Sequence, residues 1–139
     1  MLLNLKNKQL VSIINFLNKL ELKTKESRSR SKLSNLFTEK LEELQKDEKE
    51  LLVRFSKKDD DGNPVMIGQN FDIPQDTENE WIEERTALLN ETISVDCSEL
   101  KVHTERLTSV LIDLDMILKD EDAIAYDVLL DQLEKEGDE

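Results

Sequence analysis

Apolar side chains recur at every third or fourth position over much of this sequence, which is the spacing of one face of an α-helix. The first such stretch contains Leu10, Ile13, Leu17 and Leu20, and it predicts a helix over residues 8–20. The sequence therefore starts with a short amphipathic helix whose apolar face needs a partner to cover it.

The longest apolar stripe predicts one helix over about residues 25–55. About thirty residues at roughly 1.5 Å of rise each make a rod of about 45 Å. Both flanks of the stripe are rich in Glu and Lys, which is typical of a helical hairpin or a coiled-coil arm. We therefore expect other helices or a second copy to cover this stripe. Its members are Leu33, Leu36, Phe37, Leu41, Leu44, Leu51, Leu52 and Phe55.

A turn and a β-hairpin follow the long helix. The stretch KKDDDGNP at residues 57–64 combines charges with Gly and Pro, so the chain reverses there. Short apolar groups on both sides of GQN at residues 68–70 predict a small β-hairpin over about residues 65–73. Residues 92–95 alternate between polar and apolar side chains and are compatible with a third strand added to this hairpin.

Three further helical patterns occupy the second half of the chain. One covers about residues 78–91, after the capping-box pair Thr77 and Glu80, and the last covers residues 124–133. The pattern between them is the most regular, and it continues to Leu118. Its apolar members are Leu107, Val110, Leu111, Leu114, Ile117 and Leu118. On the helix at 78–91, the side chains expected to face inward are Trp81, Ile82, Leu88 and Leu89.

These elements predict a mainly α fold in which a single helical domain, residues 1–139, is built around the long helix. A chain of this length buries enough surface for one core. Apolar and charged residues each make up 37% of the chain and aromatic residues only 4%, so the core must consist mainly of Leu, Ile and Val. No run of apolar residues is long enough to span a membrane or to act as a signal peptide, so we expect a soluble, cytoplasmic protein.

Charge is distributed unevenly along the chain. Residues 1–58 contain 14 Lys and Arg against 8 Asp and Glu, whereas residues 59–139 contain 5 against 24. Such opposite charges favour pairing between the two regions, within one molecule or between two. The acidic region, densest at residues 113–122 and 131–139, also fits a protein that imitates DNA, which is an alternative function for the chain.

The basic segment at the start of the long helix contains the candidate residues for contact with a partner or an anion, which are Lys23, Lys25, Arg28 and Arg30. Free amides at a helix start, together with guanidinium groups, bind phosphates or carboxylates. Three roles stay open, namely pairing with acidic residues of the same or another chain, a solvated face, and contact with phosphate or nucleic acid. We favour pairing, because a net charge of −13 and the few aromatic residues disfavour nucleic acid.

The sequence contains no recognisable motif for catalysis, a cofactor or a metal. Around DDDG at residues 59–62, the register of a calcium-binding EF-hand would place Lys57 at its first ligand position and Gly68 at its twelfth. His103 and Cys97 are the only residues of their kinds, which disfavours a zinc site and excludes an internal disulfide. We therefore expect no enzymatic activity, no cofactor and no metal.

Four segments resemble a family of small proteins of unknown function encoded by tailed phages and prophages of Gram-positive bacteria. They are NFLNKLELK at 15–23, KESRSR at 25–30, KKDDDGNPV at 57–65 and LLNET at 88–92. The similarity runs over most of the chain in the same order. It implies a small phage protein made in the host bacterial cytoplasm, and it implies no particular activity or catalytic residue.

The features taken together lead us to expect a non-enzymatic module for protein–protein interaction, whose partner is a phage or host protein. One alternative is an acidic inhibitor that imitates DNA and occupies a host defence or DNA-binding protein. A further alternative is a minor virion or assembly component. Self-association, most simply as a dimer, is also expected because the long stripe of Leu and Phe is hard to cover with the remaining short helices.

Overall fold

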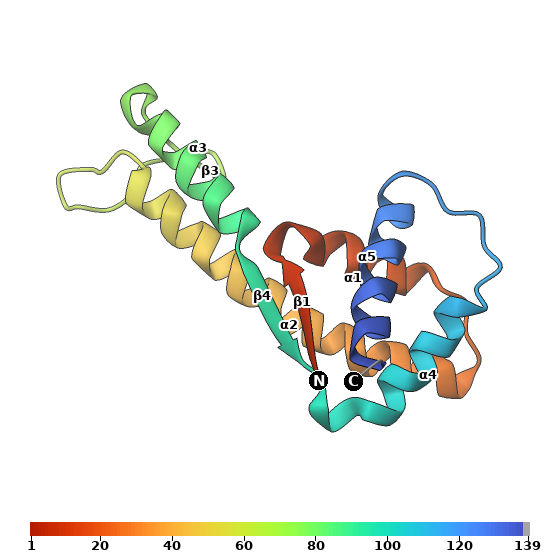
Figure 1. Cartoon of the computed structure of the whole chain (residues 1–139). Coiled ribbons are helices and arrows are strands. Elements are labelled where there is room, and N and C mark those ends of the chain that lie inside the picture. The colour runs from red at the N-terminus through yellow and green to blue at the C-terminus, as the bar shows by residue number, and fades with distance from the viewer. Residues whose placement is uncertain (138–139) are drawn as a thin grey trace. The chain divides into compact units, whose positions relative to one another are not determined.

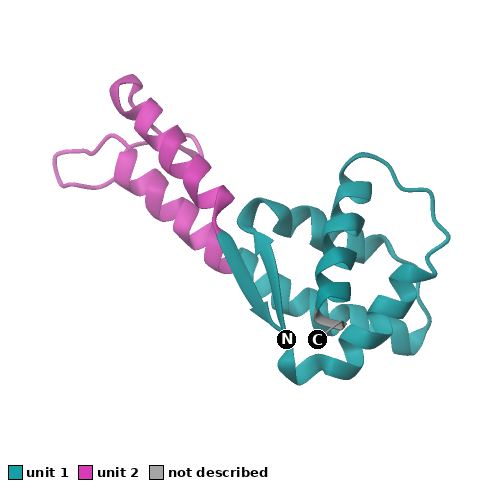
Figure 2. Ribbon diagram, in the orientation of Figure 1, with its two compact units in different colours: residues 1–41, 92–139 teal, residues 42–91 magenta. Residues whose placement is uncertain are grey.

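The computed structural model describes residues 1–137, with side chains up to Lys135 (Figure 1). The end of the acidic run at 131–139 therefore lies outside the described residues. The chain forms two compact units (Figure 2). Unit 1 consists of Met1–Leu41 and Thr92–Glu139, and unit 2 of Glu42–Glu91.

Five α-helices confirm the mainly α fold. The predicted long helix is present as a single element, α2, and starts one residue earlier than expected. The short first helix is also present and is preceded by a 3-10 turn. The helices are α1 (Leu10–Lys19), α2 (Thr24–Phe55), α3 (Gln75–Asn90), α4 (Lys101–Ile112) and α5 (Asp120–Gly137), and the 3-10 turns are Asn7–Gln9 and Ser98–Leu100.

A two-stranded antiparallel sheet in unit 1 joins β1 (Leu2–Lys6) to β4 (Thr92–Asp96). Leu3 pairs with Val95, and both are buried. The sequence correctly predicted a strand near residues 92–95, but the expectation that it joins the hairpin at 65–73 was wrong. β4 pairs instead with β1, which the sequence analysis did not predict, because nothing local in a five-residue strand shows which distant strand completes it.

The core of unit 1 lies among α1, α4, α5 and the first part of α2. The rings of Phe16 and Tyr126 pack edge to face with centroids 6.0 Å apart. All of the large side chains that are almost completely buried belong to this unit. They are Leu3, Leu5, Leu10, Ile13, Phe16, Leu17, Leu33, Phe37, Val95, Leu107, Leu111 and Leu129.

The helix predicted to continue to Leu118 ends at Ile112. The Leu111 carbonyl oxygen accepts a hydrogen bond from the Tyr126 hydroxyl at 2.7 Å and another from the Leu114 amide at 3.3 Å. A continuing helix would have offered this carbonyl to the amide of residue 115. The Leu111 carbonyl is thus bonded by Tyr126 and Leu114 where α4 ends, and Ile117, expected in the apolar stripe, is 96% exposed.

Unit 2 contains the second part of α2, the hairpin and α3. The predicted hairpin is confirmed as β2 (Met66–Ile67) and β3 (Asn70–Phe71), joined by two residues rather than three. Gly68 has φ +62°, which a glycine adopts without strain.

Thr77 does not cap α3 as predicted, because this helix already starts at Gln75. Its hydroxyl instead donates to the Phe55 carbonyl oxygen at 3.1 Å. This bond links the end of α2 to the first turn of α3, within unit 2.

Candidate functional site

The structure separates the four predicted basic residues into two groups. Arg30 is half-buried, and its guanidinium donates to the carbonyl oxygens of Leu17, at 3.2 Å, and Leu20. These carbonyls lie at the end of α1, where a helix leaves acceptors unpaired. Its other terminal nitrogen donates to Ser27 Oγ at 3.0 Å. Arg30 thus caps α1 and is not available for a partner.

Lys23, Lys25 and Arg28 are exposed. Their side chains form no ion pair or hydrogen bond with any side chain or carbonyl that the structure describes. Pairing between the basic and acidic regions instead involves Lys19, whose Nζ lies 2.9 Å from the Asp122 carboxylate. Among the described residues, these three cations are therefore exposed and without a side-chain partner.

A Ser–His pair lies between α2 and α4. Ser29 Oγ lies 2.9 Å from His103 Nδ1 and accepts a hydrogen bond from Arg106 at 3.1 Å. Which of the two groups donates in the Ser29–His103 bond depends on the tautomer of the ring. A serine nucleophile needs access to substrate, whereas Ser29 is 0% exposed. We therefore assign this cluster to the packing of α2 against α4.

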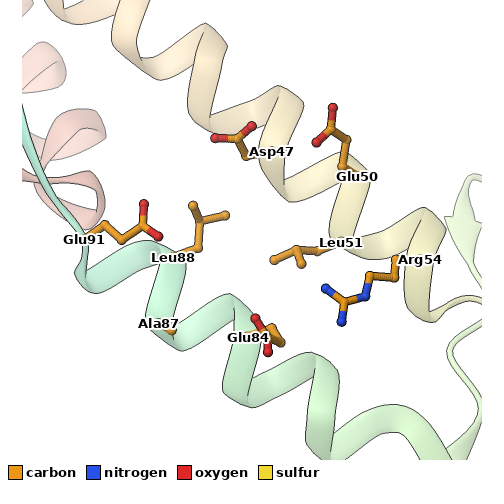
Figure 3. Close-up of a pocket in the computed structure, with 8 residues that line it drawn as sticks. All are labelled: Asp47, Glu50, Leu51, Arg54, Glu84, Ala87, Leu88 and Glu91. Carbon is orange, nitrogen blue, oxygen red and sulfur yellow. The ribbon is translucent and has the colours of Figure 1, made fainter.

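A cleft of about 280 Å³ lies between the second part of α2 and α3, within unit 2 (Figure 3). Leu51 and Leu88 point into the space between the two helices. Carboxylates border it on both helices, and a single guanidinium lies on the α2 side. Its lining consists of Asp47, Glu50, Leu51 and Arg54 from α2, and of Glu84, Ala87, Leu88 and Glu91 from α3.

The four carboxylates of this cleft have no neutralising partner in the described part of the chain. Asp47, Glu50, Glu84 and Glu91 form no ion pair or side-chain hydrogen bond there, and the Arg54 guanidinium lies 4.9 Å from the centre of the Phe55 ring. Four carboxylates against one guanidinium leave the cleft with a net negative charge, so a further cationic group is favoured there.

The apolar face of unit 2 is only partly covered. Leu51 is half-buried, and so are Trp81 and Leu89, both predicted to face inward. Leu88 is 9% exposed as predicted, but Ile82 is 45% exposed and does not face inward. Two helices alone cannot enclose a stripe of this width, so part of it stays in contact with solvent.

The chemistry that this cleft supports is binding of cations and apolar side chains. No group of three or more His, Cys, Asp or Glu residues within residues 1–137 is arranged to hold a metal ion. The cleft residues were missed in the sequence because carboxylates on helices usually form solvated faces. The signal that would have identified them is acidic residues on the same helix faces as Leu51 and Leu88, but only the structure shows that these faces meet.

The fold and this cleft define a class of mainly helical, acidic protein with an incompletely covered helical hairpin. The chain belongs to the family described as protein of unknown function (DUF1617), which matches residues 1–138. No curated protein and no solved structure matches it. In the described part of the chain, no helix is both long and apolar enough to cross a membrane.

Proposed function

We propose that this protein is a non-enzymatic module for protein–protein interaction, encoded by a phage and acting in the cytoplasm of its Gram-positive bacterial host. The observation that carries this proposal is the partly covered apolar face of the α2–α3 hairpin in unit 2. A protein partner that covers Leu51 and its neighbours would remove this apolar surface from water, which stabilises a complex by about 25 cal/mol per Å².

The alternative of an acidic protein that imitates DNA is supported by the unpaired carboxylates of unit 2. A surface of this kind would occupy a basic groove of a host defence or DNA-binding protein, in place of phosphates. The leucines at the centre of the cleft favour the first proposal, because the backbone of DNA offers no counterpart to an apolar floor. A minor virion or assembly component is the third role that we consider.

The test is capture of partners by tagged chain in infected host cells, with Leu51→Ser compared with Val102→Ser. Val102 lies on α4 in unit 1 and is exposed, so its replacement removes a similar apolar group elsewhere. Circular dichroism would confirm equal helicity. We expect a specific partner that is lost with Leu51→Ser and kept with Val102→Ser. Equal recovery by both variants would contradict the proposal.

The same experiment separates the other two roles. Release of the partner by duplex DNA, and a steep loss between 50 and 200 mM salt, would identify the protein as a DNA mimic. Mass spectrometry that finds the chain in purified virions at a constant copy number would identify a virion component.

A further inference from the structure

We propose that the cleft between α2 and α3 receives a basic amphipathic helix of another protein. This inference rests on the proposed function and specifies the chemistry of the partner. Three observations support it, which are the geometry of the hairpin, the uncovered apolar residues and the arrangement of charge along the cleft.

The geometry favours a helix as the occupant. α2 and α3 run side by side in unit 2 and leave a groove between them (Figure 3). A third helix laid along such a groove completes a three-helix layer by inserting its side chains between those of the first two. Helix-in-groove docking of this kind uses apolar residues at positions i, i+3, i+4 and i+7. The volume of about 280 Å³ lies at the lower end of small-molecule pockets and accommodates inserted side chains.

The apolar side chains that line the groove, Leu51 and Leu88, require apolar residues on the occupant. Leu51 is half-buried and points into the groove, as does Leu88 on the facing helix. A purely cationic ligand would leave these side chains uncovered and would gain only screened surface attraction, worth little in physiological salt.

Four carboxylates against the single guanidinium of Arg54 give the groove a net negative charge, which favours basic residues on both sides of the occupant's apolar stripe. Asp47 and Glu50 border the groove on α2, and Glu84 and Glu91 border it on α3. Glu84 and Glu91 are two helical turns apart, or about 10 Å, so the acidic border extends over about two turns of an occupant. Lys or Arg on both sides of the occupant's apolar face would meet these carboxylates.

A second copy of the chain matches this description less well. Its exposed basic face at the start of α2 contains Lys25, Arg28 and Lys32, and the neighbouring exposed residues Thr24 and Ser31 are also polar. This face supplies the charge but not the apolar residues that the groove requires. A different protein is therefore the better occupant.

The test uses a fluorescent 18-residue peptide of Leu and Lys, with Leu at helical i, i+3, i+4 and i+7 spacing, titrated with the full chain at 150 mM salt. The cleft variant Glu84→Gln/Glu91→Gln is compared with Glu78→Gln/Glu80→Gln, which changes two exposed carboxylates of α3 outside the cleft. We expect the cleft variant to weaken binding at least tenfold and the control variant less than twofold. Replacing the peptide's Leu by Ser should also weaken binding at least tenfold.

Equal weakening by both pairs, or unchanged binding of the Ser peptide, would show general attraction to an acidic protein and overturn the inference. Sedimentation that shows a dimer for the wild type and a monomer for Glu84→Gln/Glu91→Gln would also overturn it, because a second copy would then occupy the groove. If the peptide does not bind but partner capture still depends on Leu51, the inference fails and the proposed function stands. If the peptide binds as expected but no Leu51-dependent partner is captured, the proposed function fails.

Discussion

Units 1 and 2 share the helix α2 but differ in how well they bury its apolar stripe. In unit 1, Leu33 and Phe37 are completely buried, and Leu36 and Leu41 are half-buried. In unit 2, the most deeply buried members, Leu44 and Phe55, remain 4% and 7% exposed, and Leu51 and Leu52 are half-buried. The spacing of the stripe is similar in both parts, so the helical pattern does not explain the difference. In unit 1, α1 and α4 form hydrogen bonds with the first part of α2, and α5 and a sheet complete the unit, while unit 2 contains α3 and a short hairpin beside the second part of α2. A regular stripe predicts a helix, but the available partners decide how deeply it is buried.

The largest expected effect tests this contrast directly. Replacement of the buried Phe16 by Ala in unit 1 should lower the free energy of unfolding by about 3–5 kcal/mol, because the cavity left behind cannot collapse. Leu51→Ala in unit 2 should cost about 1 kcal/mol, since its side chain is only partly buried. Urea titration followed by circular dichroism measures both. Equal losses would mean that unit 2 is as well packed as unit 1.

A smaller effect is expected where a buried polar contact holds unit 1 together. Arg30→Met should cost about 1.5–3 kcal/mol, because the carbonyls of Leu17 and Leu20 lose a charged donor. The control is Arg28→Met on the neighbouring exposed face, which should change stability by less than about 0.5 kcal/mol. Thermal and urea unfolding of the two variants provide the comparison. A loss with Arg28→Met as large as that with Arg30→Met would show that the exposed face is structural as well.

In unit 2, the hydrogen bond from the Thr77 hydroxyl to the Phe55 carbonyl is expected to stabilise the contact between α2 and α3. Thr77→Val removes the donor to the Phe55 carbonyl and should cost about 0.5–1.5 kcal/mol. Hydrogen exchange should show the loss as faster exchange of the α3 amides, with those of α4 unchanged. Thr86→Val, at an exposed position of the same helix, is the matched control. Unchanged exchange in α3 would mean that the partly buried leucines alone hold the hairpin.

The smallest effect concerns the surface of unit 1. The Ser98 hydroxyl and amide both donate to the Asp96 carboxylate, the amide at 3.0 Å, and these bonds lower the pKa of Asp96. Because the folded pKa is depressed, the contribution to stability is present above the ordinary aspartate pKa and is lost as the pH falls through the folded value. Ser98→Ala should raise the pKa of Asp96, which NMR titration measures. An unchanged pKa would show that the amide alone sets it.

The sequence predicted elements whose signals are local. The stripe of α2, the turn around Gly62 and the hairpin at Gly68 each depend on neighbouring residues, and each was confirmed. The features that could not be predicted from the sequence involve contacts between residues far apart in the chain. The partner of β4 is β1, and near its end α4 accepts a hydrogen bond from the distant Tyr126.

The candidate sites also show that local signals can be predicted from the sequence and distant contacts cannot. The sequence grouped Arg30 with three other cations, because only the folded chain brings the end of α1 within reach of its guanidinium. Lys23, Lys25 and Arg28 were correctly placed at the start of the long helix, and their role stays a prediction. The acidic cleft could not be derived from the sequence because its two borders are separated by the hairpin.

The pairing of β1 with β4 also sets the order in which the chain can fold during synthesis. Leu3 and Leu5 are synthesised before all of unit 2, whereas Val95 and the rest of β4 follow after it. At 5–20 residues per second, β1 waits roughly 5 to 18 s for its partner. The helices and hairpin of unit 2 use local contacts that form within microseconds. Unit 2 therefore takes shape first, and the unpaired N-terminal strand is the segment most in need of protection from aggregation until the second half of unit 1 arrives.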